Sequence, residues 1–104
     1  MKQTPRILIA EDEAAFREAA AEYLRDAGWE IETCGDGEAA WNAFRKSLHD
    51  VVITDIRMPK MDGIALLEKI HELVPSLPVI MITAHGSIET SVEAMRRGAV
   101  DYIL

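Results

Sequence analysis

Short apolar runs alternate with helix-like patterns along this chain, and that alternation limits the folds open to it. Residues 7–10, 51–54 and 79–82 are almost continuously apolar, which is typical of parallel strands covered by helices on both faces. Residues 29–33 place two glutamates on one face and indicate a half-exposed edge strand. Residues 101–104 supply a fifth strand. The order of these runs predicts an α/β fold in which strand–helix units repeat around a parallel sheet.

Four segments between these strands have the spacing of amphipathic helices. The first carries five apolar residues at helical spacing, namely Phe16, Ala20, Tyr23, Leu24 and Ala27. Gly28 is placed to end this helix in the left-handed conformation. Asp36 can cap the second helix, and Asp62 with Gly63 opens the third. The fourth is expected to start near Ser87.

Composition indicates one small globular domain. A length of 104 residues suits a single domain, and 49% hydrophobic with 28% charged residues is a globular balance. The 18 acidic and 11 basic residues give a formal net charge of -7, which disfavours direct binding of nucleic acid. The apolar stretch at residues 7–10 is too short to span a membrane, and Cys34 is the single cysteine. We therefore expect a cytoplasmic protein with a reduced thiol and no membrane association.

Polar side chains follow three of the predicted strands at their carboxyl ends. Glu11 and Asp12 follow the first strand, Asp55 follows the third, and Thr83 follows the fourth. Ligands of open α/β sheets bind outside the carboxyl ends of the strands, so these groups converge if the strands are neighbours. Close carboxylates raise one another's pKa unless a cation joins them, and Mg²⁺ prefers such oxygen ligands. The pattern predicts a Mg²⁺ site, since the sequence has no His/Cys cluster to favour zinc.

Each of these residues taken alone also has a structural explanation. Asp12 could cap the first helix, and a single aspartate after a strand is common in loops. Their joint placement favours a reactive site instead. An aspartate carboxylate beside Mg²⁺ can act as a nucleophile toward phosphoryl groups, with the metal and a hydroxyl stabilising charge on the transferring oxygens.

The motifs that follow the strands, taken in order over the whole chain, resemble the receiver domain of two-component response regulators. They are Glu11-Asp12, Asp55 with Met58-Pro59 and Asp62-Gly63, Thr83-Ala84, and Gly98 with Asp101-Tyr102. The resemblance implies a doubly wound, flavodoxin-like sheet of five parallel strands in the order 2-1-3-4-5. It also implies that residues 1–104 form one receiver domain, the phosphoacceptor of a phosphorelay.

The resemblance gives the acidic residues their roles. Asp55 would accept the phosphoryl group from a histidine kinase or a phosphotransfer protein. Asp12, Asp55 and the main-chain carbonyl of Arg57 would ligate Mg²⁺, and Glu11 would hold the ion through water. No further enzymatic activity is expected beyond this self-catalysed transfer to Asp55.

The resemblance also implies a conformational switch. Thr83 would turn toward the phosphoryl oxygen and Tyr102 would swing inward, a two-state change that phosphorylation biases. Residues 83–90 and 95–99 are similar, more narrowly, to receivers of bacterial enhancer-binding transcription activators that carry ATPase and DNA-binding modules. Those output modules would lie outside this chain, which would then make no direct contact with nucleic acid.

The sequence departs from the family pattern at its carboxyl end. The family's fifth strand normally ends in a lysine that contacts the phosphoryl group, followed by a proline and a fifth helix, whereas this sequence ends at Leu104. We expect a C-terminally truncated domain that lacks the last helix and exposes an apolar patch beside helix one. A homodimer or a swapped oligomer would bury that patch. Phosphorylation is expected to be weaker without the fixed positive charge.

Three other functions remain open. A Mg²⁺-dependent aspartyl phosphohydrolase would need an acid two residues after the nucleophile, where this chain has Arg57. A flavin-type nucleotide site would need a phosphate loop after the first strand, where residues 11–13 are all acidic and would repel phosphate. A receiver-like interaction module that is never phosphorylated is favoured only by the missing lysine.

Overall fold

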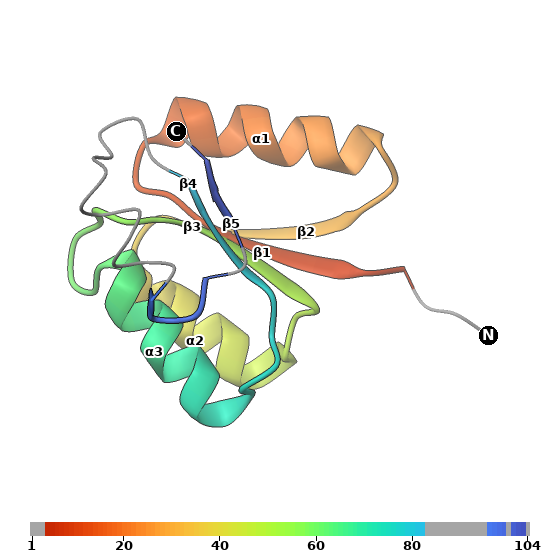
Figure 1. Cartoon of the computed structure of the whole chain (residues 1–104). Helices are drawn as coiled ribbons and strands as arrows, with labels where there is room; N and C mark the ends of the chain where they lie inside the picture. Colours follow the sequence, from red (N-terminus) through yellow and green to blue (C-terminus); the bar gives the residue numbers. More distant parts are fainter. Residues whose placement is uncertain (1–3, 83–95, 100, 104) are drawn as a thin grey trace.

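A parallel sheet forms the centre of the molecule (Figure 1). The computed structural model describes residues 4–82, 96–99 and 101–103, and within them the strands follow the order β2-β1-β3-β4-β5. The strands are β1 (Arg6–Ala10), β2 (Glu30–Cys34), β3 (Val51–Asp55), β4 (Val79–Ile82) and β5 (Asp101–Ile103). Every neighbouring pair is parallel. The predicted α/β class and strand order are confirmed, with β1 and β3 inside the sheet and β2 at its edge.

Helices cover both faces of the sheet (Figure 1). Helix α1 (Ala14–Asp26) lies on one face, and α2 (Gly37–Ser47) and α3 (Gly63–Leu73) lie on the other. The predicted caps are confirmed, because Asp36 Oδ1 accepts the Ala39 N–H at 2.7 Å and Asp62 Oδ1 accepts the Ala65 N–H at 2.8 Å. Gly28 follows α1 with a φ of 99°, as expected of a glycine that ends a helix. The helix predicted from Ser87 falls in residues 83–95, outside the described part of the chain.

The hydrophobic core is thick on the face covered by α2 and α3 and thin on the face covered by α1. The core on the α2 and α3 face includes seven fully buried side chains: Leu8, Phe44, Val52, Leu66, Leu67, Ile70 and Met81. The core on the α1 face consists of the buried residues Ile7, Ile9, Ala21 and Ile31. Full burial of one Leu or Ile contributes roughly 1.5–3 kcal/mol to folding, so most of the hydrophobic stabilisation comes from the α2 and α3 side.

Helix α1 does not use its whole predicted apolar stripe to pack on the sheet. Phe16 and Tyr23 belong to the predicted apolar spacing, but these residues are 47% and 75% exposed. Ala20, Ala21 and Leu24 pack against the sheet instead. The reason is tertiary: a face of small residues lets the helix approach the sheet more closely than a face carrying two aromatic rings. The predicted apolar spacing is therefore present, but only part of it packs on the sheet.

The exposed rings of α1 lie on the flank that looks over β3 and β4. On the other flank, Arg25 donates a hydrogen bond to the main-chain oxygen of Ile31 in β2 at 3.1 Å, so the ring-bearing flank points away from β2. A helix about 10 Å wide covers only about two strands that are about 4.8 Å apart. Ile53, Ile80 and Ile82 are accordingly only half-buried.

We call this region the α1 flank surface and define it by Phe16, Tyr23, Ile53, Ile80 and Ile82. The apolar patch beside the first helix stays a prediction, and these are the described residues on which it would lie. Within the part of the chain that the structure describes, none of the helices has the length and apolar character needed to cross a membrane.

Candidate functional site

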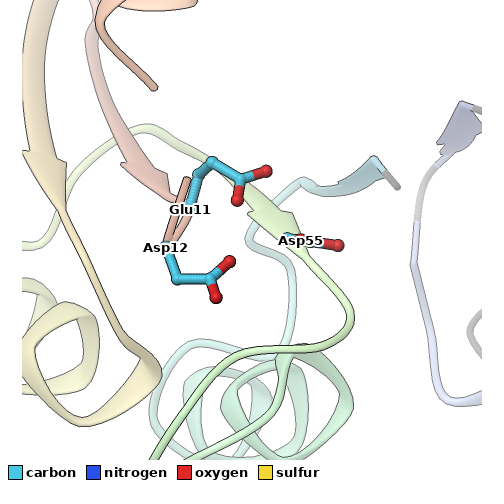
Figure 2. A group of neighbouring side chains, drawn as sticks. All are labelled: Glu11, Asp12 and Asp55. Atoms are coloured by element: carbon cyan, nitrogen blue, oxygen red, sulfur yellow. The ribbon is translucent and has the colours of Figure 1, made fainter. Parts of the chain in front are cut away.

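Three carboxylates meet at the carboxyl edge of the sheet (Figure 2). Strands β1 and β3 are neighbours, and Ala10 pairs with Thr54, so the residues that follow them in the chain lie side by side. One carboxylate oxygen each from Glu11, Asp12 and Asp55 lies within 4.8 Å of the others. The predicted convergence of the acids on one rim is therefore present.

Glu11 is held firmly in the loop after β1. Its side chain is buried, with the residue 6% exposed, and its Oε2 accepts the Glu13 N–H at 2.9 Å. Its own N–H donates to the main-chain oxygen of Cys34 at 3.0 Å. Glu13, at the N-cap of α1, makes no side-chain capping bond, and Asp12 is exposed beside it. The alternative in which Asp12 caps this helix is therefore not the one that the structure adopts.

Burial raises the pKa of Glu11 from its ordinary value of 4.5 to about 7. Desolvation is the largest cause, a hydrogen bond with Asp12 and the charges of Asp55 and Asp12 raise the pKa further, and the hydrogen bond from Glu13 opposes them. Burial of the Glu11 carboxyl, with a smaller contribution from its acidic neighbours, thus favours the protonated form up to a pH of about 7. A divalent cation would relieve the repulsion among these carboxylates.

Asp55 is positioned by its main chain as well as by its side chain. Its Oδ1 accepts the Ile56 N–H at 2.7 Å, and its main-chain oxygen accepts the Thr54 Oγ1 hydroxyl at 2.9 Å. Helix α3 begins against the same peptide, since a Cβ at Gly63 would lie 2.0 Å from the Asp55 main-chain oxygen. The Gly63 N–H donates to the Ile56 oxygen at 2.7 Å. The end of β3 and the start of α3 are therefore held in direct main-chain contact.

The loop between β3 and α3 is also pressed against the start of α2. A Cβ at Gly37 would lie 1.9 Å from the main-chain oxygen of Met61, so only glycine fits there. Met58 and Met61 are half-buried against the core, as the sequence suggests for local packing. Lys60 has a φ of 69° and is exposed, with its Nζ 4.0 Å from Asp36 Oδ2. These contacts fix the loop that carries Arg57.

The donor set fits Mg²⁺. Octahedral Mg²⁺ has ligands at about 2.1 Å, which places opposite ligand atoms about 4.2 Å apart, so oxygens within 4.8 Å need only a small side-chain adjustment. All three groups are hard oxygen ligands, and burial together with the neighbouring carboxylates raises the pKa of Glu11. Arg57 is exposed in the adjoining loop, and its main-chain carbonyl remains a predicted ligand.

The two predicted switch residues are described only in part. Thr83 lies outside the described residues, but Ile82, the residue before it in the chain, pairs with Asp55 across β3 and β4. The main chain of Tyr102 is in β5 and pairs with Met81, and its side chain is outside what the structure describes. Their roles stay predictions.

Sequence reasoning missed Arg17, which reaches the site from α1. Its Nη1 donates to the main-chain oxygen of Glu11 at 2.9 Å. The available signal was its place on the helix that directly follows the acidic pair, but an arginine on a helix is usually taken for a solvated residue.

Residues 7–104 match the family model described as the response regulator receiver domain. The chain is 38% identical over 98 residues to the transcriptional regulatory protein ZraR of Escherichia coli (strain K12). It is 40% identical over 99 residues to the response regulator protein FleR of Pseudomonas aeruginosa. These alignments cover 94% and 95% of this chain but only 22% and 21% of those proteins. The chain therefore spans about a fifth of the length of these curated relatives.

Solved structures show the same similarity. The chemotaxis protein CheY4 of Vibrio cholerae superposes with a TM-score of 0.92 at 29% identity, covering 98% of this chain and 87% of that one. NtrX from Brucella abortus gives a TM-score of 0.90 at 41% identity, covering 97% of this chain and 23% of NtrX. The likeness thus extends over nearly the whole chain, and the family match includes the three acidic residues.

Proposed function

Because this chain belongs to the family of response regulator receiver domains, we propose that it is a phosphoacceptor in which Asp55 receives a phosphoryl group. The observation that carries the proposal is the meeting of Glu11, Asp12 and Asp55, each with one carboxylate oxygen within 4.8 Å of the others. An acceptor aspartate beside a hard-cation site is suited to phosphoryl transfer.

The geometry of Asp55 supports its role as the nucleophile. Its Oδ1 is engaged by the Ile56 N–H, which leaves Oδ2 as the oxygen with no hydrogen bond among the described residues. In the proposed reaction Oδ2 attacks the phosphorus of a phosphohistidine. The new O–P bond forms as the N–P bond breaks, and the imidazole leaves with the electron pair.

The acidic neighbours prepare the site for this transfer. We propose that Asp12, Asp55 and the Arg57 carbonyl hold Mg²⁺ directly and that Glu11 holds it through water. Bound Mg²⁺ would neutralise the carboxylates and stabilise charge on the transferring oxygens. The half-buried position of Asp55 limits its contact with bulk water.

The register of the sheet supports the proposed switch, which the family resemblance implies. Ile82 pairs with Asp55 across β3 and β4, and Thr83 is the next residue after Ile82 in the sequence. We propose that Thr83 contacts the phosphoryl oxygen and that Tyr102 moves with it, which biases a two-state equilibrium. The phosphorylated state would then signal through the surface that changes.

The proposed partners come from the family. The phosphodonor would be a histidine kinase or a phosphotransfer protein in the cytoplasm. Because the chain spans about a fifth of ZraR and FleR, we propose that output modules controlling transcription, with ATPase and DNA-binding functions, lie elsewhere in the intact protein. The receiver itself would bind no nucleic acid, in keeping with its net charge of -7.

Intact mass spectrometry tests the proposal. The chain is incubated with Mg²⁺ and a small acyl phosphate, and a single acid-labile phosphoryl adduct is expected. Asp55→Asn should abolish the adduct, whereas Asp26→Asn, at the exposed end of α1, should not change it. An equal adduct in the Asp55 variant would show that the nucleophile is wrong. Sustained release of phosphate in many turnovers would favour a phosphohydrolase instead.

A further inference from the structure

The geometry points to Arg17 as a positioning residue for the metal site, because its guanidinium holds the peptide that joins Glu11 to Asp12. This inference rests on the proposed function, since it concerns the same site. It adds a residue on α1 to a site otherwise built from the loops after β1 and β3.

The contact is made with the main chain of the acidic loop. Arg17 Nη1 donates to the Glu11 main-chain oxygen at 2.9 Å, and the Arg17 side chain is only 21% exposed. The other end of Glu11 is fixed too, since its N–H donates to the Cys34 oxygen. Glu11 is thus tied to β2 through its nitrogen and to α1 through its oxygen.

This bond bears directly on Asp12. The carbonyl of Glu11 and the nitrogen of Asp12 belong to one planar peptide unit, so the bond from Arg17 fixes the plane from which the Asp12 side chain departs. Asp12 is exposed, and no hydrogen bond from another element to its carboxylate is found in residues 4–82, 96–99 and 101–103. Apart from the hydrogen bond with the Glu11 side chain, its placement therefore depends on the main chain behind it.

The surroundings of the guanidinium leave little room for another position. A Cβ at Gly35 would lie 3.3 Å from Arg17 Nη1, so the loop after β2 packs against the guanidinium. The other contact of Arg17, between its Nε and Glu18 Oε1 at 3.6 Å, is a surface ion pair of the kind that contributes little. The hydrogen bond to Glu11 is therefore the contact that specifies where the side chain lies.

Arg25 provides a matched control on the same helix. Like Arg17, it donates a hydrogen bond from its guanidinium to a main-chain oxygen. The acceptor is Ile31, at 3.1 Å. That bond lies at the far end of α1, away from the acids. Arg17→Gln and Arg25→Gln thus remove the same kind of contact, and only the first touches the metal site.

The direction of the effect separates positioning from charge. If Arg17 acted only as a nearby positive charge, its removal would make the site more negative and would tighten Mg²⁺ binding. If it positions the peptide, its removal loosens the site and weakens binding, by about 10-fold for an outer-shell partner. Arg17→Lys, which keeps the charge but not the planar guanidinium, should recover only part of the affinity.

Two measurements test the inference, Mg²⁺ titration by calorimetry and amide hydrogen exchange of the metal-free protein by NMR. In Arg17→Gln we expect about 10-fold weaker Mg²⁺ binding. We also expect about 10-fold faster exchange of the Glu11 and Glu13 amides, which are hydrogen-bonded to Cys34 and to the Glu11 carboxylate. Arg25→Gln should leave both unchanged. Unchanged or tighter binding in Arg17→Gln, or an equal loss in both variants, would overturn the inference.

The exchange measurement keeps this inference separate from the proposed function. If the unmodified chain binds no Mg²⁺, the proposed function fails at the first titration. Faster exchange at Glu11 and Glu13 confined to Arg17→Gln would still support the positioning of the loop. Unchanged exchange in that variant would refute it whether or not the metal binds.

Discussion

The α-carbon of Gly63 lies so close to Asp55 that any Cβ at position 63 would be 2.0 Å from the Asp55 main-chain oxygen. The obstacle is backbone, so Gly63→Ala must push β3 and α3 apart. We expect a loss of about 3 kcal/mol in the free energy of unfolding, measured by urea denaturation. Gly35→Ala is the control, since its Cβ would meet only a side-chain nitrogen, at 3.3 Å. Similar losses in the two variants would contradict this account.

The buried carboxyl of Glu11 predicts an unusual dependence of stability on pH. In the folded chain the pKa of Glu11 is about 7 rather than 4.5, so between these values the folded state holds a proton that the unfolded state has released. The contribution of Glu11 to the free energy of unfolding is therefore fully present below a pH of about 4.5, and it is lost as the pH rises through about 7. The measurement is thermal unfolding across this range without metal.

Glu11→Gln supplies the comparison for that measurement. It removes the titrating group, so the difference in Tm between the parent chain and the variant should change between pH 4.5 and about 7 and level off above it. A constant difference over this range would mean that Glu11 titrates normally.

Addition of Mg²⁺ should stabilise the folded chain at neutral pH. A ligand that binds only the folded state at a concentration 100 times its Kd adds about 2.7 kcal/mol to the free energy of unfolding. Asp12→Asn should remove most of this gain by deleting a ligand, and in the absence of Mg²⁺ it should raise stability by about 1 kcal/mol because one repulsive charge is gone. Differential scanning fluorimetry with and without Mg²⁺ checks both effects. An undiminished Mg²⁺ response in the variant would exclude Asp12 as a ligand.

The α1 flank surface predicts self-association of the 104-residue chain. Phe16 and Tyr23 are exposed on α1, isoleucines of β3 and β4 on the same face of the sheet are half-buried, and pairing of two such surfaces would remove apolar area from water. Sedimentation velocity should show a dimer or a larger species that grows with concentration.

Two substitutions make that prediction specific. Tyr23→Lys should shift the chain toward monomer. Leu73→Lys replaces a residue of α3 that is also exposed but lies on the opposite face of the sheet, and it should have no such effect. A monomer at all concentrations would rule out association, and equal effects of the two lysines would rule out this surface.

The strands and the acidic site could be predicted because their signals are local. A buried parallel strand must be apolar on both faces, and the residue after it must emerge at the carboxyl edge, so residues 7–10 and 51–54 locate Glu11, Asp12 and Asp55 together. The caps formed by Asp36 and Asp62 are equally local. These features need no knowledge of what packs against them.

The features that sequence reasoning missed depend on contacts between distant elements. Apolar spacing alone could not show that α1 packs through its small residues and leaves Tyr23 outside. Arg17 looks solvated until the loop that it holds is in place. His49 is 2% exposed, and its Nε2 lies 2.7 Å from Glu32 Oε1 on the far side of β1. The fold supplies a partner for Nε2 of this buried ring, which no pattern in the sequence could show.

The pairing of Ala10 with Thr54 couples the accuracy of the site to the hydrophobic core. A slip of one residue between β1 and β3 would separate the acids, and it would also turn the buried side chains of one strand toward the wrong face. Such a slip is forbidden by many apolar contacts at once rather than by the acids, which repel one another. Packing of the apolar side chains of β1 and β3 therefore sets the register of these strands, and with it the spacing of the carboxylate oxygens at the site.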